Sequence, residues 1–289
     1  MKKKPITTKP ISSPHATELL YARELSALIR QMAKEYASAL VVYKEKQDQI
    51  AVDAGNGEWL TTAVQERLKK LGDRWAERFK EFADDKSPAL IKKILRQTDL
   101  QLKSTLKDWF SAERMTLIAD TIPNPLKQSI KAHVAENVSL IKSIPAQYHE
   151  RIQGAVTRAI TGGSSYKQLV AEIRKYQGME LRRAQLIARD QVHKVSTTIT
   201  VRRCEQLGIK RFMWVHSNAG KTFREYHHRK WDGVSGLKDG RPNGLNGYIF
   251  DMNNPPVIQK ATKTQPEIRG TPGFLCSCRC MAMPVIDID

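Results

Sequence analysis

The sequence lacks long apolar segments and is poor in cysteine. No stretch approaches the roughly 18 consecutive apolar residues that predict a transmembrane helix. The basic beginning, MKKKPITTKP, is not followed by the apolar core of a secretory signal peptide. Four cysteines among 289 residues are too few for a disulfide framework. These absences predict a protein that is made and folded in a cytoplasm, where thiols stay reduced and no membrane is spanned.

Acidic residues are scarce relative to basic ones. Lys and Arg number 48 against 30 Asp and Glu, so the formal net charge is +18. Residues 181–230 hold twelve basic and three acidic side chains, a net charge of +9 (12 − 3). Such an excess favours contact with double-stranded DNA or with an acidic partner, and a solvated helix surface is the alternative interpretation. The candidate residues for nucleic-acid contact are Arg182, Arg183, Arg202 and Arg203.

Apolar residues at spacings of three and four predict helices through the first two thirds of the chain. Residues 1–16 are rich in Lys and Pro and predict a flexible basic arm. A helical N-terminal region is expected over 17–126. Its first two helices are expected at about 17–47 and 59–82, separated by the helix-breaking sequence VDAGNGEW.

Proline and glycine divide this helical pattern further. Ser87 and Pro88 predict the cap and the first turn of a third helix. A second helical region, 127–208, is expected in several pieces, with Pro145 in a first turn. Its longest apolar stripe ends at Gly208, a residue suited to a helix C-terminus.

After residue 208 the apolar period changes from about 3.6 to 2. In KRFMWVHS, Phe212, Trp214 and His216 alternate with Met213 and Val215, which predicts a half-buried strand. GYIFDM and CRCMAMPVIDI predict two more. The turn-rich sequences between them predict long loops. We therefore expect an α+β fold, mainly α-helical in its first two thirds, with a small loop-rich α+β unit over 209–289.

Three of the four cysteines alternate near the end of the chain. Cys276, Cys278 and Cys280 would share one face of a strand. A disulfide between the first and the last is excluded because their Cα atoms would lie too far apart. Two interpretations remain: the thiols pack as small apolar groups, or Cys278 and Cys280 bind a structural zinc ion together with His227 or His216.

A pair of histidines suggests an enzymatic alternative. His227 or His228, near Asp232, could act as the general base of a metal-dependent nuclease. No spacing assigns these roles, and a pair of histidines in a loop is more often a surface feature. The sequence SNAGKT lacks the frame of a phosphate-binding loop, so a nucleotide cofactor is not expected.

Several motifs together resemble the phage head morphogenesis proteins of the Mu F-like minor head protein family. They are the helix containing LIARDQ, the strand and loop WVHSNAGKTFREYHHRKWDG, and the terminal PGFLCSCRCMAMPVI, and they occur in the order of the family. The resemblance covers about residues 137–286. The positions that it assigns to family motifs are Trp214, His216, Arg224, His227, Asp232, Gly233, Pro272, Gly273, Cys278, Arg279 and Cys280.

The resemblance implies a minor head protein of a tailed bacteriophage. Such proteins act in head assembly at the portal vertex, with the portal protein and other head proteins as partners, and some accompany the DNA. It implies a location in the virion after synthesis in the host bacterium, without enzymatic activity. Other members place a further cysteine where Arg224 stands, so His216 and Cys276 are the candidate substitutes for this ligand. The alternative function is a metal-dependent nuclease or a DNA-binding accessory factor.

Overall fold

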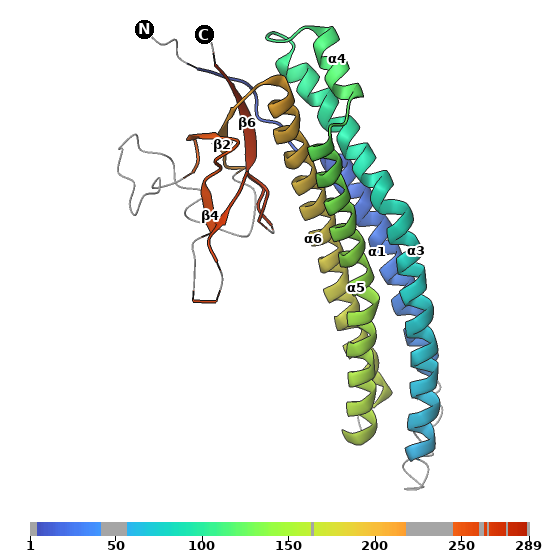
Figure 1. Cartoon of the computed structure of the whole chain (residues 1–289). Coiled ribbons are helices and arrows are strands. Elements are labelled where there is room, and N and C mark those ends of the chain that lie inside the picture. Colours follow the sequence, from blue (N-terminus) through green and yellow to red (C-terminus); the bar gives the residue numbers. More distant parts are fainter. Residues whose placement is uncertain are drawn as a thin grey trace. The chain divides into compact units, whose positions relative to one another are not determined.

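The computed structural model describes residues 5–41, 57–162, 165–217, 245–259, 263–264, 266–275 and 277–287 (Figure 1). The helices in these ranges are α1 (His15–Ala39), α3 (Gly57–Leu106), α4 (Ala112–Asp120), α5 (Asn124–Gly162) and α6 (Tyr166–Leu207). The strands are β1 (Ile6–Thr7), β2 (Arg211–Val215), β3 (Ile249–Asp251), β4 (Val257–Gln259), β5 (Ile268–Arg269) and β6 (Met281–Ile286). The fold is therefore α+β and mainly helical, as expected. Among the residues with described positions, no helix is long and apolar enough to cross a membrane.

The chain forms two compact units that are each assembled from separate stretches of sequence. The first unit comprises the described residues of 1–18, 90–133 and 189–289, and includes all the described strands. The second comprises those of 19–89 and 134–188 and is helical. This division differs from the sequential regions expected at 17–126, 127–208 and 209–289, because the long helices run from one unit into the other.

Helix α6 has clear start and stop signals in its sequence. The hydroxyl of Ser165 accepts a hydrogen bond from the Gln168 N–H, and the Gln168 side chain accepts one from the Ser165 N–H at 2.7 Å. This reciprocal capping box satisfies two N–H groups at the helix start. The helix ends at Leu207, and Gly208 follows with a φ of +79°. The expected end of this helix is confirmed, and the helix is continuous through Gly178.

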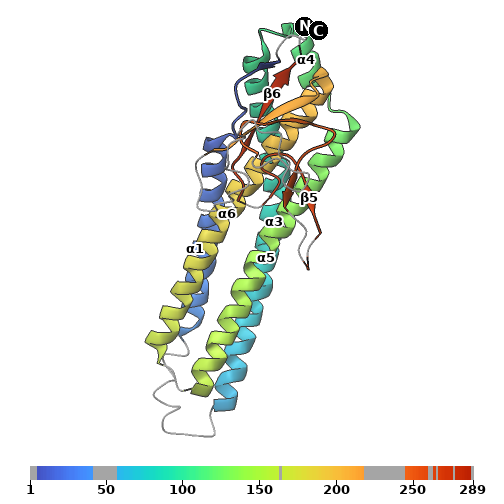
Figure 2. The same cartoon turned by 90° about the vertical axis from the view of Figure 1, so that its left-hand side faces the viewer.

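Two prolines lie inside helices rather than at their starts. The helix expected to begin at Pro88 is continuous with the one before it in α3, and Pro145 lies within α5 (Figure 2). Ser87 does not cap a helix: it is fully buried, and its hydroxyl accepts a hydrogen bond from the Asn137 side chain at 3.1 Å. A proline removes one backbone hydrogen bond, and burial of apolar residues on both sides of it outweighs this loss.

A four-stranded antiparallel sheet in the first unit has the order β1-β6-β2-β3. Strand β2 pairs with β6 from Arg211 opposite Val285 to Val215 opposite Met281. Strand β1 pairs with the other edge of β6, with Ile6 opposite Ile286. Residues 6–7 are therefore an edge strand rather than part of the flexible arm expected over 1–16.

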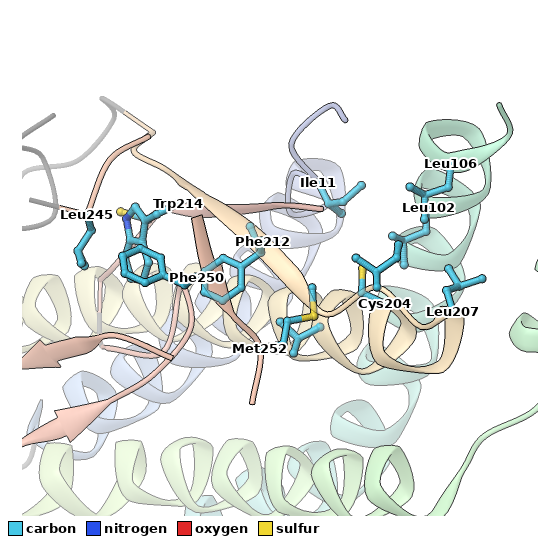
Figure 3. Close-up of a cluster of buried hydrophobic side chains, with 14 of the residues drawn as sticks. Ile11, Leu102, Leu106, Cys204, Leu207, Phe212, Trp214, Leu245, Phe250 and Met252 are labelled. Atoms are coloured by element: carbon cyan, nitrogen blue, oxygen red, sulfur yellow. The ribbon is translucent and has the colours of Figure 1, made fainter. Parts of the chain in front are cut away.

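A hydrophobic core in the first unit joins the sheet to the ends of α3 and α6 (Figure 3). Phe212 and Trp214 point inward from β2 and are fully buried, which confirms the alternation predicted from KRFMWVHS. The Trp214 ring meets the Phe250 ring of β3 edge to face, with centroids 6.5 Å apart. This core fixes the end of β2 and the beginning of β6, where the motif residues lie.

Candidate functional site

The segment that carries the cysteines is a turn followed by a strand. Strand β6 begins only at Met281, so Cys278 and Cys280 precede it, contrary to the expected strand CRCMAMPVIDI. The Cys278 N–H donates to the Leu275 carbonyl at 3.0 Å, and Ser277 has a φ of +61°. This left-handed residue turns the chain before the strand starts. Cys278 and Cys280 are both buried, as the packing interpretation requires.

One face of α6 holds this turn in place. Asp190 is buried, and its carboxylate accepts a hydrogen bond from the Ser277 N–H at 2.8 Å. One helical turn later, Nε2 of His193 lies 2.9 Å from the Cys280 carbonyl oxygen. Burial lowers the pKa of His193, against the hydrogen bond to Cys280 and nearby negative charge. A neutral His193 that donates from Nε2 fits this geometry.

The turn approaches α6 so closely that one position requires glycine. Gly273 has a φ of +81°, and a Cβ atom there would lie 2.8 Å from Cδ2 of His193 and 3.0 Å from Oγ1 of Thr197. A side chain at this position would therefore meet both an unfavourable backbone conformation and the helix surface. This explains in physical terms why the motif PGF has glycine at its centre.

Replacement of Gly273 by Ala should lower the free energy of unfolding by about 2–4 kcal/mol, the sum of the left-handed backbone cost and overpacking. Gly247 is a matched control, since its φ is +81° and nothing lies within 4 Å of a Cβ there. Gly247→Ala should cost only the backbone component, about 1–2 kcal/mol. Urea denaturation of the two variants measures the difference. Equal losses would contradict the close approach of the turn to α6.

The neighbouring Cys278 thiol and burial raise the pKa of the Cys280 thiol, and Trp214 and the Ser217 backbone act in the opposite direction. Two adjacent soft donors fit half of a tetrahedral zinc site, and the ion would displace both protons. Disulfides are absent among the described cysteines: Cys204, Cys278 and Cys280 are free thiols.

The remaining expected zinc ligands lie in or beside the undescribed segment. His216 follows β2 directly, and its N–H donates to the Asn246 side chain at 3.0 Å. Strand β2 pairs with β6 up to Val215 opposite Met281. His216, which follows Val215, and Cys280, which precedes Met281, therefore lie at the same end of this pair of strands. His227 falls outside the described residues. Within the described part of the chain, no three side chains of His, Cys, Asp or Glu gather closely enough to hold a metal ion.

Structural zinc therefore stays a prediction that elemental analysis can check. If the ion is bound, the purified protein should carry one zinc per chain, and Cys278→Ser or Cys280→Ser should lose it. A chelator should then make the C-terminal unit more sensitive to protease. The matched control is Cys204→Ala, which removes a fully buried free thiol of the same unit and should keep the metal. Equal protease sensitivity with and without chelator would favour packed thiols instead.

The four arginines expected to contact nucleic acid occupy different environments. Arg182 is exposed on α6. Arg183 is half-buried and donates to Ser143 at 2.7 Å. Arg202 is partly exposed and pairs with Glu205 at 2.9 Å.

Arg203 differs from the other three because only 1% of it is exposed. Its guanidinium donates to both carboxylate oxygens of Asp99, at 2.8 and 2.9 Å, and to main-chain carbonyls near the end of α4. A buried, paired guanidinium is not available to a phosphate. Arg203 is therefore a structural residue, which corrects its expected place on a nucleic-acid surface. Burial raises the pKa of Asp99, and the bonds from Arg203 oppose that rise.

Sequence reasoning did not single out Asp190 or His193 as positioning residues. A signal was present, since the two polar residues lie three apart on one face of α6. Of the expected nuclease and motif positions, Arg224, His227, His228, Asp232 and Gly233 fall outside the described residues.

Comparison with known proteins supports the resemblance found in the motifs. Residues 150–283 match the sequence model of a family described as Phage Mu protein F like protein. An uncharacterized protein of Haemophilus influenzae is 28% identical over 284 residues, which cover 96% of this chain and 55% of that protein. The chain thus spans about half the length of this curated relative. No solved structure matches the chain.

Proposed function

We propose that this chain, whose residues 150–283 carry the Phage Mu protein F-like sequence, is a head morphogenesis protein of a tailed bacteriophage. The family match is the observation that carries the proposal, because the curated relative is itself uncharacterized. Contacts between α6 and the turn that carries PGF and the motif cysteines support it, since these two described segments of the resemblance pack together.

The finer proposal is a minor component of the virion that contacts the portal protein and other head proteins. A structural role of this kind requires association with particles and no turnover of a substrate. It is tested by mixing the full-length protein with purified procapsids and with isolated portal rings, followed by sedimentation. We expect co-sedimentation with both at a constant ratio to the portal subunit. No association with either would overturn the proposal.

Contact with packaged DNA is a further part of this proposal. The net charge of +18 supports it, and so do the exposed Arg182 and the partly exposed Arg202. Such contact would be made to phosphates, without sequence preference, and would weaken steeply with salt. Arg203 takes no part because it is buried.

The salt dependence of DNA binding tests this contact. The double variant Arg182→Gln/Arg202→Gln should reduce the slope of log K against log salt by about 2, or roughly one for each lost contact. The matched control neutralises two exposed lysines of α3, Lys92 and Lys93. A shallow slope in the wild type, or equal effects in both double variants, would rule out a binding surface at these arginines.

The enzymatic alternative has a separate test. A metal-dependent nuclease should cleave plasmid DNA when divalent metal is added, and His227→Ala should abolish the cleavage. The head proposal predicts intact plasmid across several metals. Cleavage that depends on His227 would instead establish the nuclease.

A further inference from the structure

A small hollow lies in the first compact unit, apart from the Cys278 and Cys280 thiols. It has a volume of about 170 Å³ and is formed by the segment before α1, one face of α6, the end of β2 and the beginning of β6. Its lining residues are Ser12, Ser13, His15, Glu18, Arg189, His193, Ser217, Arg279 and Met281.

Two arginines in this lining have no carboxylate partner among the described residues. Arg189 comes from α6 and Arg279 from the turn between the two motif cysteines. The Nε atom of Arg189 is buried and has no hydrogen-bond partner in the structure. A buried N–H without an acceptor costs free energy, so a water molecule or an anion that binds there would stabilise it.

The nearby carboxylates are already engaged elsewhere. Asp190, the neighbour of Arg189 in the chain, accepts from the Ser277 N–H at 2.8 Å and pairs with Lys194 at 3.3 Å. Glu18, which lines the hollow, lies 3.5 Å from Nδ1 of His15. Neither Asp190 nor Glu18 pairs with Arg189 or Arg279, and no other described carboxylate does.

The other walls of the hollow offer donors to an anion. Ser13 supplies a hydroxyl group shortly before α1, whereas the Ser12 hydroxyl already bonds the Gln101 side chain at 3.0 Å. The Thr17 and Glu18 N–H groups donate to the Pro14 carbonyl, so the helix start offers the N–H groups of His15 and Ala16. The partial positive charge of this helix end also favours an anion. His193 adds no full charge, because burial lowers its pKa.

We propose that this hollow is a binding site for a phosphate-type oxyanion, held between the guanidinium groups of Arg189 and Arg279 at the start of α1. Guanidinium groups bind phosphate oxygens through paired, charge-assisted hydrogen bonds, and two of them facing one hollow supply the charge that a phosphate dianion needs. Glu18 is the one carboxylate in the lining, and it lies 3.5 Å from Nδ1 of His15. The site is independent of the proposed role in head assembly.

Isothermal titration of the full-length protein with inorganic phosphate, at constant ionic strength in chloride, tests the proposal. We expect saturable binding of one phosphate per chain, weakened at least about tenfold by Arg189→Gln and by Arg279→Gln. The matched control is Arg202→Gln, which removes the same charge from α6 outside the hollow and should bind as the wild type does. No saturable binding, or equal affinity in all four proteins, would overturn the proposal.

Two further points keep the test decisive. Thermal unfolding first establishes that each variant is folded. If Arg189→Gln does not fold, Arg279→Gln alone decides, since the Arg279 side chain is only half-buried.

Competition then identifies the source of the anion. Displacement of phosphate only by a 5′-phosphorylated oligonucleotide indicates a phosphomonoester end, and displacement also by the unphosphorylated form indicates a phosphodiester. Displacement by neither indicates free phosphate.

Discussion

Replacement of Arg203 by Met should lower the free energy of unfolding by about 3–5 kcal/mol, the usual cost of removing one partner of a buried ion pair. The Arg203 guanidinium bonds both oxygens of Asp99 and the carbonyls of Ile118, Ala119 and Thr121. Met keeps most of the side-chain volume, so the loss comes from the charge and its hydrogen bonds. The substitution leaves the Asp99 carboxylate and the carbonyls of α4 without their donor.

The neighbouring arginine is a matched control. Arg202 pairs with Glu205 on the surface, with 40% of its side chain exposed, and Arg202→Met should cost about 1 kcal/mol or less. Urea denaturation followed by circular dichroism measures both. Burial raises the pKa of Asp99, so mildly acidic buffer should protonate this carboxylate in the Arg203 variant and remove its unpaired charge. The loss of unfolding free energy caused by Arg203→Met should therefore be smaller there. Equal losses in the two variants would contradict the burial of Arg203.

Truncation of Trp214 to Ala should cost about 3–5 kcal/mol, as is usual for a large aromatic residue in a core. Trp214 is fully buried on β2 and packs against Phe250. Trp214 belongs to the same hydrophobic core as Cys278 and Cys280, so the truncation removes support from the turn that carries the motif cysteines. The truncation would leave a cavity between β2 and that turn. Limited proteolysis should therefore cleave the C-terminal unit of the variant faster than that of the wild type.

A second tryptophan of the same unit provides the comparison. Trp109 follows α3 and is 37% exposed, so Trp109→Ala should cost about 1 kcal/mol or less. Thermal unfolding of both variants gives the difference. If the two truncations are equally mild, Trp214 does not occupy the core of the sheet.

The helical architecture follows largely from local signals. The capping box at Ser165 and Gln168 and the glycine at 208 bound α6, because hydrogen bonds between near neighbours determine helix ends. The prediction of helix starts at the two prolines is wrong because it used local signals alone. Pro88 and Pro145 are local signals of a helix start, but burial of apolar residues on both sides, which depends on the rest of the fold, keeps α3 and α5 continuous.

The site was predictable only where it depends on alternation along the chain. The inward position of Trp214 on β2 follows from this alternation. Cys278 and Cys280 are also buried, but they lie in the turn before β6, so strand alternation is not the reason. The pair of Arg203 with Asp99 joins residues 104 positions apart, and no local pattern separates a buried arginine from its exposed neighbour Arg202. The contacts of the cysteine turn with α6 are likewise long-range and appear only in the folded chain.

Quantitative mass spectrometry of purified mature phage particles tests the central proposal most directly. The number of copies of this chain is measured against the portal subunit of the same particles. A minor head protein at the portal vertex should be present in a few copies per particle, at a ratio to portal that stays constant between preparations. Absence of the chain from mature particles would contradict its role as a component of the virion.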